Sequence, residues 1–217
     1  MNALFANRRD AGRQLAQVLR DSSFTDVLVL ALPRGGVPVG YEIARALRAP
    51  LDVMLVRKIG APGHKEYGIG ALVDGASPQI VIDHRAAEQV GATDEYIQRQ
   101  VALELAEIER RRSLYRTGPA PELRGRTVIV ADDGIATGGT VRAALRALER
   151  SAAARVILAV PVAPADALAE MRELCSEVVC LATPEPFYAV GAHYEDFTQT
   201  SDDEVVQLLR AANAPAG

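Results

Sequence analysis

A pair of adjacent carboxylates and a small-residue loop form the part of this 217-residue sequence best suited to chemistry. Asp132 and Asp133 follow the apolar run 128–131, and Gly138 and Gly139 come shortly afterwards. Such a β-branched apolar run is typical of a strand buried in a parallel sheet. Paired carboxylates suit vicinal hydroxyl groups, or a divalent cation brought in with phosphate groups. The strand is therefore expected to end at a ligand site.

The residues after this loop predict a helix. One helix face carries the apolar residues Val141, Ala144, Leu145 and Leu148. The loop then lies at a helix N-terminus, where unpaired backbone N–H groups and the positive end of the helix dipole favour a phosphate. Glycines let the backbone approach that phosphate closely, and the hydroxyls of Thr137 and Thr140 can donate to it. Strand, loop and helix together indicate a sugar phosphate site.

A second strand, loop and helix repeat this arrangement earlier in the chain. The apolar run 26–32 leads to Arg34, Gly35 and Gly36, and Val39, Ile43 and Leu47 then mark a helix face. Ligands of open parallel α/β sheets bind at the carboxyl edge of the strands. We therefore expect a cation there, with backbone N–H groups that the glycines leave open to an anion.

Two further cations follow the next apolar run. A strand over 51–58 is expected to end in Arg57 and Lys58, and the segment 59–70 carries four glycines. Its other polar residues include His64 and Lys65. A mobile, cationic loop beside a phosphate site could close over a ligand, because closure excludes water and strengthens electrostatic contacts.

These motifs resemble those of the type I phosphoribosyltransferases, in which a strand leads into a D-D or E-D pair and a T-G-G-T-like loop. The P-R-G-G, R-K-x-G-x-P and D-D-G-x-A-T-G motifs resemble most closely a group of bacterial predicted phosphoribosyltransferases. The resemblance implies an α/β fold, with a central parallel sheet and helices on both faces. It also implies a single domain over 1–217, with a flexible lid at about 57–83 and a small C-terminal hood at about 184–201.

The resemblance implies transfer of the ribose 5-phosphate group of phosphoribosyl pyrophosphate to a nitrogen nucleophile, with a nucleobase as the expected acceptor and pyrophosphate as the leaving group. Mg²⁺ would be bound with the phosphoribosyl pyrophosphate, with no direct protein ligand assigned. Carried over by motif, the catalytic residues are Arg34, Arg57, Lys58, Asp132 and Asp133. The substrate-binding residues are Gly35, Gly36, Ala136, Thr137, Gly138, Gly139, Thr140, Tyr188 and Val190. The family often has a strained or cis peptide just before the glycines of its pyrophosphate loop.

The acceptor is left open. In the family, the C-terminal region joins the N-terminal segment as a hood that selects the base, and Phe187 or Tyr188 could stack on a ring. Ala136 stands where the 6-oxopurine enzymes place a carboxylate beside the base. The A-T-G-G-T loop is more like that of the adenine enzymes, but the hood does not match theirs.

The remaining elements follow from periodicity. A packing helix over 8–20 is expected to bury Ala11, Leu15, Val18 and Leu19 and to turn Arg8, Arg9, Asp10 and Arg13 to solvent. We also expect a hairpin over 71–83, helices over 94–115, 165–174 and 202–209, and strands over 154–163 and 177–183.

Composition narrows the class of protein. The content of hydrophobic residues is 49% and the net charge is −4, so a globular protein is expected and broad binding to nucleic acid is not. With no signal-peptide pattern and no apolar run long enough to span a membrane, a cytoplasmic location is expected. A homodimer is a family expectation only. Two alternatives stay open: an RNA-binding regulator of the same fold that senses phosphoribosyl pyrophosphate or a nucleotide, and a sugar phosphate-binding protein whose lid has decayed.

Overall fold

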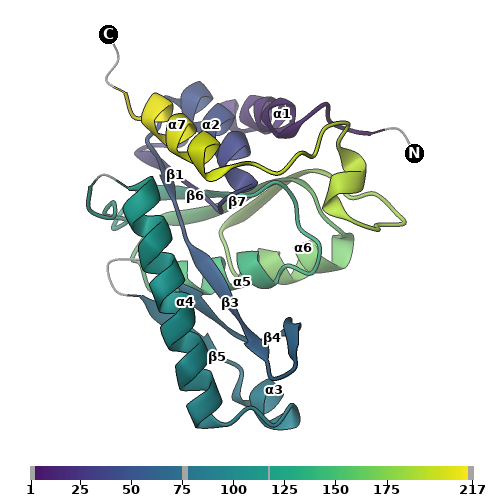
Figure 1. Cartoon of the computed structure of the whole chain (residues 1–217). Coiled ribbons are helices and arrows are strands. Elements are labelled where there is room, and N and C mark those ends of the chain that lie inside the picture. Colours follow the sequence, from purple (N-terminus) through teal and green to yellow (C-terminus); the bar gives the residue numbers. More distant parts are fainter. Residues whose placement is uncertain (1–2, 75–77, 117, 215–217) are drawn as a thin grey trace.

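A five-stranded parallel sheet forms the centre of the molecule (Figure 1). The computed structural model describes residues 3–74, 78–116 and 118–214, without the side chains of Lys65 and Glu66. In spatial order the strands are β2 (Leu51–Val53), β1 (Val27–Ala31), β6 (Thr127–Ala131), β7 (Arg155–Val162) and β8 (Glu177–Ala182). Because the strands run in parallel, β1 and β6 end side by side, with Ala31 opposite Ala131. The loops that follow these two strands therefore meet at one edge.

Helices cover both faces of this sheet. One face packs against α1 (Arg8–Arg20), α2 (Gly36–Leu47) and α7 (Asp202–Ala212), and the other against α5 (Gly139–Leu148) and α6 (Ala165–Arg172) (Figure 1). Successive residues of a strand point to opposite faces, so Ile129 lies in the first core and Val128 in the second. Since both faces are buried, the strands need the continuous apolar runs of the sequence. The predicted α/β fold class is confirmed.

A second, antiparallel sheet hangs below the first, against the long helix α4 (Figure 1). Its strands are β3 (Val56–Ala61), β4 (His64–Val73) and β5 (Gln79–Ile82), which lead into α3 (His84–Gln89) and α4 (Asp94–Tyr115). The prediction of one strand over 51–58 was wrong, because β2 ends at Val53 and β3 belongs to the other sheet. The expected hairpin over 71–83 is present as β4 and β5, and its turn at 75–77 lies outside the described residues.

The prediction of a loop over 59–70 was also wrong, because most of that segment lies in β3 and β4. Two of its glycines, Gly68 and Gly70, lie within β4 at close approaches, whereas Gly63 lies in the turn between β3 and β4 with φ +73°. A Cβ on Gly70 would lie 2.6 Å from the carbonyl oxygen of Val81, and one on Gly68 would lie 3.1 Å from the side chain of Lys58. Glycine content therefore misled the prediction, since glycines in strands often mark a close approach.

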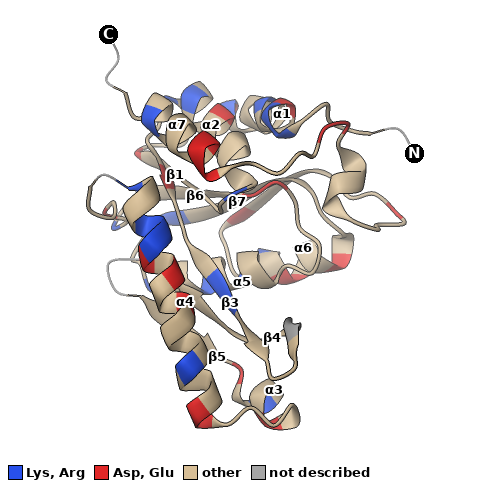
Figure 2. Cartoon of the chain, in the orientation of Figure 1, with Lys and Arg blue, Asp and Glu red and all other residues tan. Residues whose placement is uncertain are grey.

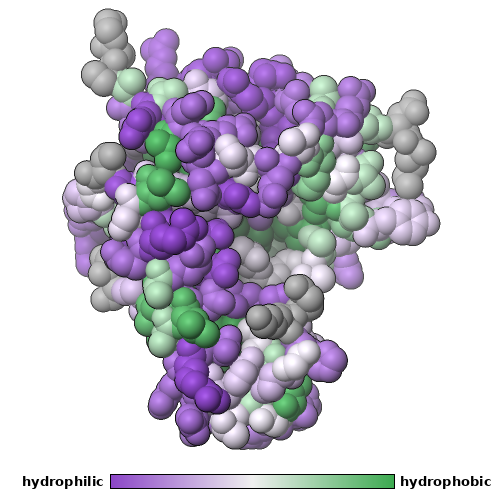
Figure 3. All heavy atoms as spheres, viewed as in Figure 1, coloured by the Kyte–Doolittle hydropathy of each residue, from purple (hydrophilic) through white to green (hydrophobic). Residues whose placement is uncertain are grey.

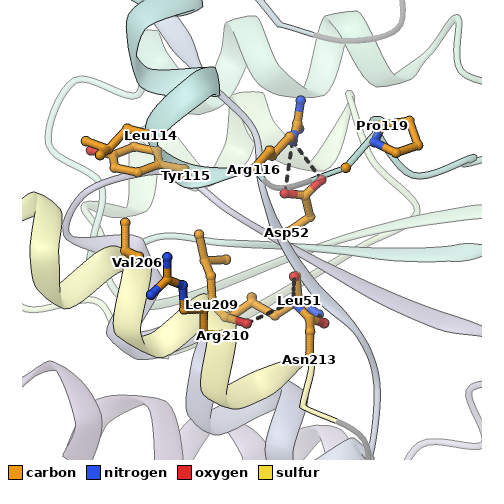
Figure 4. A pocket seen from close by; sticks show the side chains of 11 residues that line it. Leu51, Asp52, Leu114, Tyr115, Arg116, Pro119, Val206, Leu209, Arg210 and Asn213 are labelled. Carbon is orange, nitrogen blue, oxygen red and sulfur yellow. Dashed lines mark hydrogen bonds and ion pairs between the residues drawn. The ribbon is translucent and has the colours of Figure 1, made fainter.

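Charged side chains connect the second sheet to the first. Arg116, just beyond α4, donates to both carboxylate oxygens of Asp52 at 3.0 and 2.9 Å and to Asp74 at 2.7 Å. Figure 4 shows the Arg116 and Asp52 pair at one side of the cavity between α4 and α7. Asp74 follows β4 and its side chain is fully buried. These ion pairs hold the end of β4 in the second sheet close to β2 of the first sheet.

The N-terminal residues 3–7 pack against the C-terminal segment, residues 190–198. Leu4 and Phe5 donate their N–H groups to the carbonyl oxygen of His193, which ends the short helix η1 (Val190–His193). The ring of Tyr194 lies 5.4 Å from that of Phe5. The N-terminal segment thus packs beside the C-terminal segment, beyond the ends of β6 and β7 (Figure 1).

Helix α1 has the predicted bounds, but two of its side chains differ from expectation. Val18 is 48% exposed, since α1 packs on α2 through the stripe that includes Ala11, Leu15 and Leu19. Arg8, which was expected to face solvent, is only 11% exposed. Its guanidinium reaches the loop after β6, which the sequence could not indicate.

Candidate active site

The loops after β1 and β6 pack directly on one another. A Cβ on Gly35 would lie 2.0 Å from Oδ2 of Asp133, and a Cβ on Gly36 would lie 2.5 Å from the carbonyl oxygen of Ala131. Real Cβ atoms do not approach other atoms that closely. The two glycines therefore make room for the loop that carries the carboxylate pair.

The glycine loop offers fewer free amides than expected. The N–H of Gly36 already donates to the carbonyl oxygen of Leu32 at 3.0 Å, and that of Val37 donates to Arg34 at 3.1 Å. The expectation that these glycines leave their N–H groups open to an anion is thus wrong for Gly36. The peptide bond between Pro33 and Arg34 is cis, as the family resemblance implies.

Arg34 lies at the carboxyl edge of the sheet, close to α7. Its Nη1 is 3.8 Å from Oδ1 of Asp202, at the start of that helix, and Tyr115 at the end of α4 donates its hydroxyl to the same oxygen. Burial and the bond to Asp202 raise the pKa of Tyr115 to about 12, so its hydroxyl keeps its proton at neutral pH. Arg34 is 29% exposed in the side chain and can reach a ligand at this edge.

The carboxylate pair is partly buried. Oδ1 of Asp132 accepts the N–H of Asp133 at 2.9 Å, and Oδ2 of Asp133 accepts from Nε of Arg8 at 2.7 Å. Burial, then the neighbouring Asp133 carboxylate, raises the pKa of Asp132 well above its usual range. Burial also raises the pKa of Asp133, against the opposing effect of the Arg8 guanidinium. Both carboxyl groups therefore hold a proton to a higher pH than exposed aspartates do.

The loop before α5 presents a run of unpaired amides. Among the described residues, none accepts a backbone hydrogen bond from the N–H groups of residues 136–141, and Arg142 is the first to donate, to Gly138 at 2.8 Å. Gly138 has φ +74°, a left-handed conformation that favours glycine. The side chains of Ala136, Thr137 and Thr140 are exposed. Consecutive free amides at a helix N-terminus form an anion site.

A cavity of about 290 Å³ lies between this loop and the second sheet. It is lined by Thr137, Gly139 and Thr140 on one side and by Lys58 of β3 on the other. Figure 2 marks the basic residues of β3, and Figure 3 shows a hollow between the sheets on this face of the molecule. Lys58 therefore lies across the cavity from the loop before α5.

Arg57 and Lys58 do not act as a pair at one strand end. Neighbouring strand residues point to opposite faces, so when Lys58 lines the cavity, Arg57 turns to α4. Nε of Arg57 donates to Oε2 of Glu104 at 2.6 Å. The structure thus brings Lys58, but not Arg57, to the cavity. The side chain of Lys65 lies outside the described residues.

This difference predicts distinct effects for two neighbouring substitutions. Lys58→Ala should lower kcat about 100- to 1000-fold, the range for losing one group that stabilises transition-state charge. Arg57→Ala should lower the free energy of unfolding by about 1 kcal/mol, since it breaks a half-buried ion pair, and should change kcat far less. Steady-state kinetics and urea denaturation of both variants measure the contrast. Equal loss of kcat in both would contradict it.

The predicted base-binding residues lie in different surroundings. Val190 is next to the loop after β6, because a Cβ on Gly134 would lie 2.6 Å from its Cγ1. Tyr188 is 74% exposed and Phe187 stacks on His193, with ring centroids 5.2 Å apart. Three aromatic or cationic neighbours at this end were missed: Arg8, Tyr194 and Phe197.

A cavity of about 340 Å³ between α4 and α7 contains none of the predicted site residues (Figure 4). Its Asp52 is held by Arg116, and its Asn213 bonds to the backbone of Leu51. Burial raises the pKa of Asp52 against the effect of Arg116. We therefore assign this cavity to structural packing.

In the described part of the chain, no helix combines the length and apolar character needed to cross a bilayer.

Known proteins are similar to this chain over most of its length. A family model described as "Phosphoribosyl transferase domain" matches residues 2–196. "Putative phosphoribosyl transferase Rv0571c" of Mycobacterium tuberculosis H37Rv is 46% identical over 212 residues, which make up 97% of this chain and 47% of that protein. The same identity and coverage hold for the CDC 1551 strain protein. The chain thus spans about half the length of these relatives.

Solved structures give the same result for the fold. The crystal structure of TT1426 from Thermus thermophilus is similar with a TM-score of 0.78 and 39% sequence identity, covering 94% of this chain and 97% of that one. AQ2163 from Aquifex aeolicus, at 14% identity, has a TM-score of 0.50 over 85% of this chain and 78% of its own. The second likeness concerns the fold alone.

Proposed function

Since this chain belongs to the phosphoribosyl transferase family, we propose that it transfers the ribose 5-phosphate group of phosphoribosyl pyrophosphate to a nitrogen nucleophile, with a nucleobase as the expected acceptor. A bond forms between C1 of the ribose and the acceptor nitrogen, and the bond between C1 and the diphosphate oxygen breaks. Pyrophosphate leaves with the bonding electrons, and the acceptor nitrogen releases a proton. The protein needs no nucleophile of its own.

The observation that carries this proposal is the junction of the two loops, where Gly35 and Gly36 pack against the carboxylate pair beside a run of free amides. The amides of residues 136–141, with Thr137 and Thr140, would hold the 5′-phosphate. Asp132 and Asp133 would accept hydrogen bonds from the ribose hydroxyls.

The charge requirement of the reaction fits the remaining groups. As the ribose gains positive charge and the diphosphate gains negative charge, carboxylates stabilise the first and cations the second. Arg34 at the sheet edge and Lys58 across the cavity are the candidates for the diphosphate. Arg57 would act indirectly, by holding β3 on α4 through Glu104. Positioning and electrostatics together would supply the rate enhancement.

Mg²⁺ is expected with the substrate. Among the described residues, no cluster of three or more His, Cys, Asp or Glu side chains is arranged to hold a metal. Mg²⁺ bound with phosphoribosyl pyrophosphate would be held chiefly by substrate phosphate oxygens and water, as is usual for this ion. When bound, the ion would neutralise charge on the leaving diphosphate.

Calorimetric titration with phosphoribosyl pyrophosphate, with and without Mg²⁺, tests the proposal. A panel of nucleobases is then added to the complex while pyrophosphate is assayed. Magnesium-dependent binding followed by pyrophosphate release with one base supports the transferase and identifies its acceptor. Binding without turnover on any base favours a sensor of the same fold. No binding contradicts the assignment of the loop after β6.

A further inference from the structure

The first turn of α1 reaches into the proposed site, although it lies far from the site motifs in sequence. Arg8 and Asp133 are 125 residues apart, and Nε of Arg8 donates to Oδ2 of Asp133 at 2.7 Å. The side chains are 11% and 16% exposed. An ion pair this sheltered is weakly screened by water, so its geometry matters more than that of a surface pair.

Arg8 is itself held from the C-terminal segment. Its Nη1 donates to the carbonyl oxygen of Thr198 at 2.7 Å, and its guanidinium carbon lies 3.8 Å from the centroid of the Phe197 ring. Guanidinium groups stack on aromatic faces while donating in their own plane. The guanidinium of Arg8 donates in its plane to Asp133 and Thr198 and stacks on Phe197 with its face. Together these contacts fix the orientation of the side chain.

The same segment also holds the backbone of Asp133. The hydroxyl of Tyr194 donates to the carbonyl oxygen of Asp133 at 2.6 Å, and the Tyr194 ring lies 5.0 Å from that of Phe197. Asp133 is therefore fixed at its carboxylate by Arg8 and at its carbonyl by Tyr194. With Oδ2 taken by Arg8 and packed against Gly35, Oδ1 is the oxygen left for a ligand.

We infer that Arg8 is a positioning residue of this site: by holding Oδ2 of Asp133 against the Phe197 and Thr198 segment, it fixes the other carboxylate oxygen where the ribose hydroxyls of phosphoribosyl pyrophosphate bind. The inference rests on the proposed function, which it deepens. It assigns the N-terminal helix and the C-terminal segment a joint role in binding the donor substrate, rather than the acceptor alone.

Arg9 provides a matched control. It is the next residue of α1, and its Nε donates to Oε1 of the buried Glu42 at 2.7 Å, a carboxylate outside the proposed site that also pairs with Arg45 at 3.1 Å. Arg8→Met and Arg9→Met thus each remove one arginine from a sheltered carboxylate. Only the first carboxylate belongs to the proposed site.

The experiment compares wild type, Arg8→Met, Arg8→Lys and Arg9→Met by calorimetry with phosphoribosyl pyrophosphate and Mg²⁺, and by steady-state kinetics. Arg8→Met should raise the Kd for phosphoribosyl pyrophosphate about 10- to 100-fold, the range for losing a partner that orients a binding group. Its KM for the acceptor should stay near wild type. Arg8→Lys keeps the charge but not the fork, so its Kd should lie between the two. Arg9→Met should bind as wild type does.

The outcomes separate the two proposals. If wild type does not bind phosphoribosyl pyrophosphate, the proposed function fails and this inference fails with it. If wild type binds, but Arg8→Met and Arg9→Met show the same Kd, the inference alone is overturned, since a merely structural Arg8 lowers the active fraction without changing Kd. Should Arg8→Met not fold, Phe197→Leu removes only the stacking surface and should raise the Kd in the same direction by a smaller factor.

Discussion

Gly35→Ala should lower kcat/KM for phosphoribosyl pyrophosphate about 100-fold while leaving the protein folded. Gly35 has φ −61° and ψ −34°, which alanine adopts readily, so the substitution causes no backbone strain. The obstacle is the Asp133 carboxylate, whose Oδ2 would lie 2.0 Å from the new Cβ. A side chain can turn away from such a contact, but a shift of about 1 Å in a substrate-positioning group is enough for a loss of this size.

Gly36→Ala provides the contrast. The Cβ of the new alanine would lie 2.5 Å from the carbonyl oxygen of Ala131, at the end of β6. This oxygen belongs to the backbone, so it cannot move aside by a change of side-chain rotamer. We expect a loss of about 1–3 kcal/mol in the free energy of unfolding, as for other overpacked sites. The exposed Gly118 is the control, because no described atom lies within 4 Å of its Cβ position. Urea denaturation and initial rates of all three variants test this; wild-type kinetics for Gly35→Ala would refute the packing argument.

These glycines illustrate what the sequence can and cannot predict. Strand, loop and helix periodicity was enough to place both loops at one sheet edge, since parallel strands that end together bring their loops together. The same periodicity assigned Gly36 to anion binding, whereas its N–H bonds to Leu32. Why a position is glycine depends on what a side chain would meet, and that lies in the tertiary structure.

The second sheet was missed for a related reason. Four glycines within 59–70 are typical of a loop, yet Gly68 and Gly70 lie in β4, and a Cβ on Gly70 would lie 2.6 Å from the carbonyl oxygen of Val81 in the paired strand. Because β3 is a strand, the side chains of Arg57 and Lys58 point to opposite faces of the sheet. A prediction that treats the segment as a loop cannot separate the two. Local composition failed here because strand pairing overrode it.

Arg8 could not have been found from sequence. An arginine in the first turn of an amphipathic helix is normally solvent-exposed, and the neighbouring Arg9, with a side chain 45% exposed, fits that pattern. Arg8 is distinguished only by a partner 125 residues away and by a segment that returns to the N-terminus after β8. Motif reading finds the groups that touch a ligand more readily than the groups that hold them.

Asp132→Asn should make the protein more stable at neutral pH and nearly inactive. Burial and the adjacent Asp133 raise the pKa of Asp132 well above the ordinary value of 3.8, so the folded state holds a proton that the unfolded state has released. Stability from this group is fully present below pH 3.8 and is lost as the pH rises through the raised pKa. Asparagine carries no charge to desolvate, and its Oδ1 can still accept the N–H of residue 133.

The increase in the free energy of unfolding of Asp132→Asn should therefore appear at pH 7–8 and disappear towards pH 3.8 and below. Each kcal/mol gained corresponds to roughly 2–4 °C in Tm for a chain of this size. The kcat should fall about 100- to 1000-fold, because Oδ1 of the amide still accepts the N–H of Asp133, and its Nδ2 donates where a carboxylate oxygen would accept from a ribose hydroxyl. Thermal melts across pH measure the first effect, with the exposed Glu149→Gln as a control that should change little. A variant less stable than wild type at pH 7.5 would contradict the burial cost assigned to Asp132, and a fully active variant would contradict its role in binding the ribose.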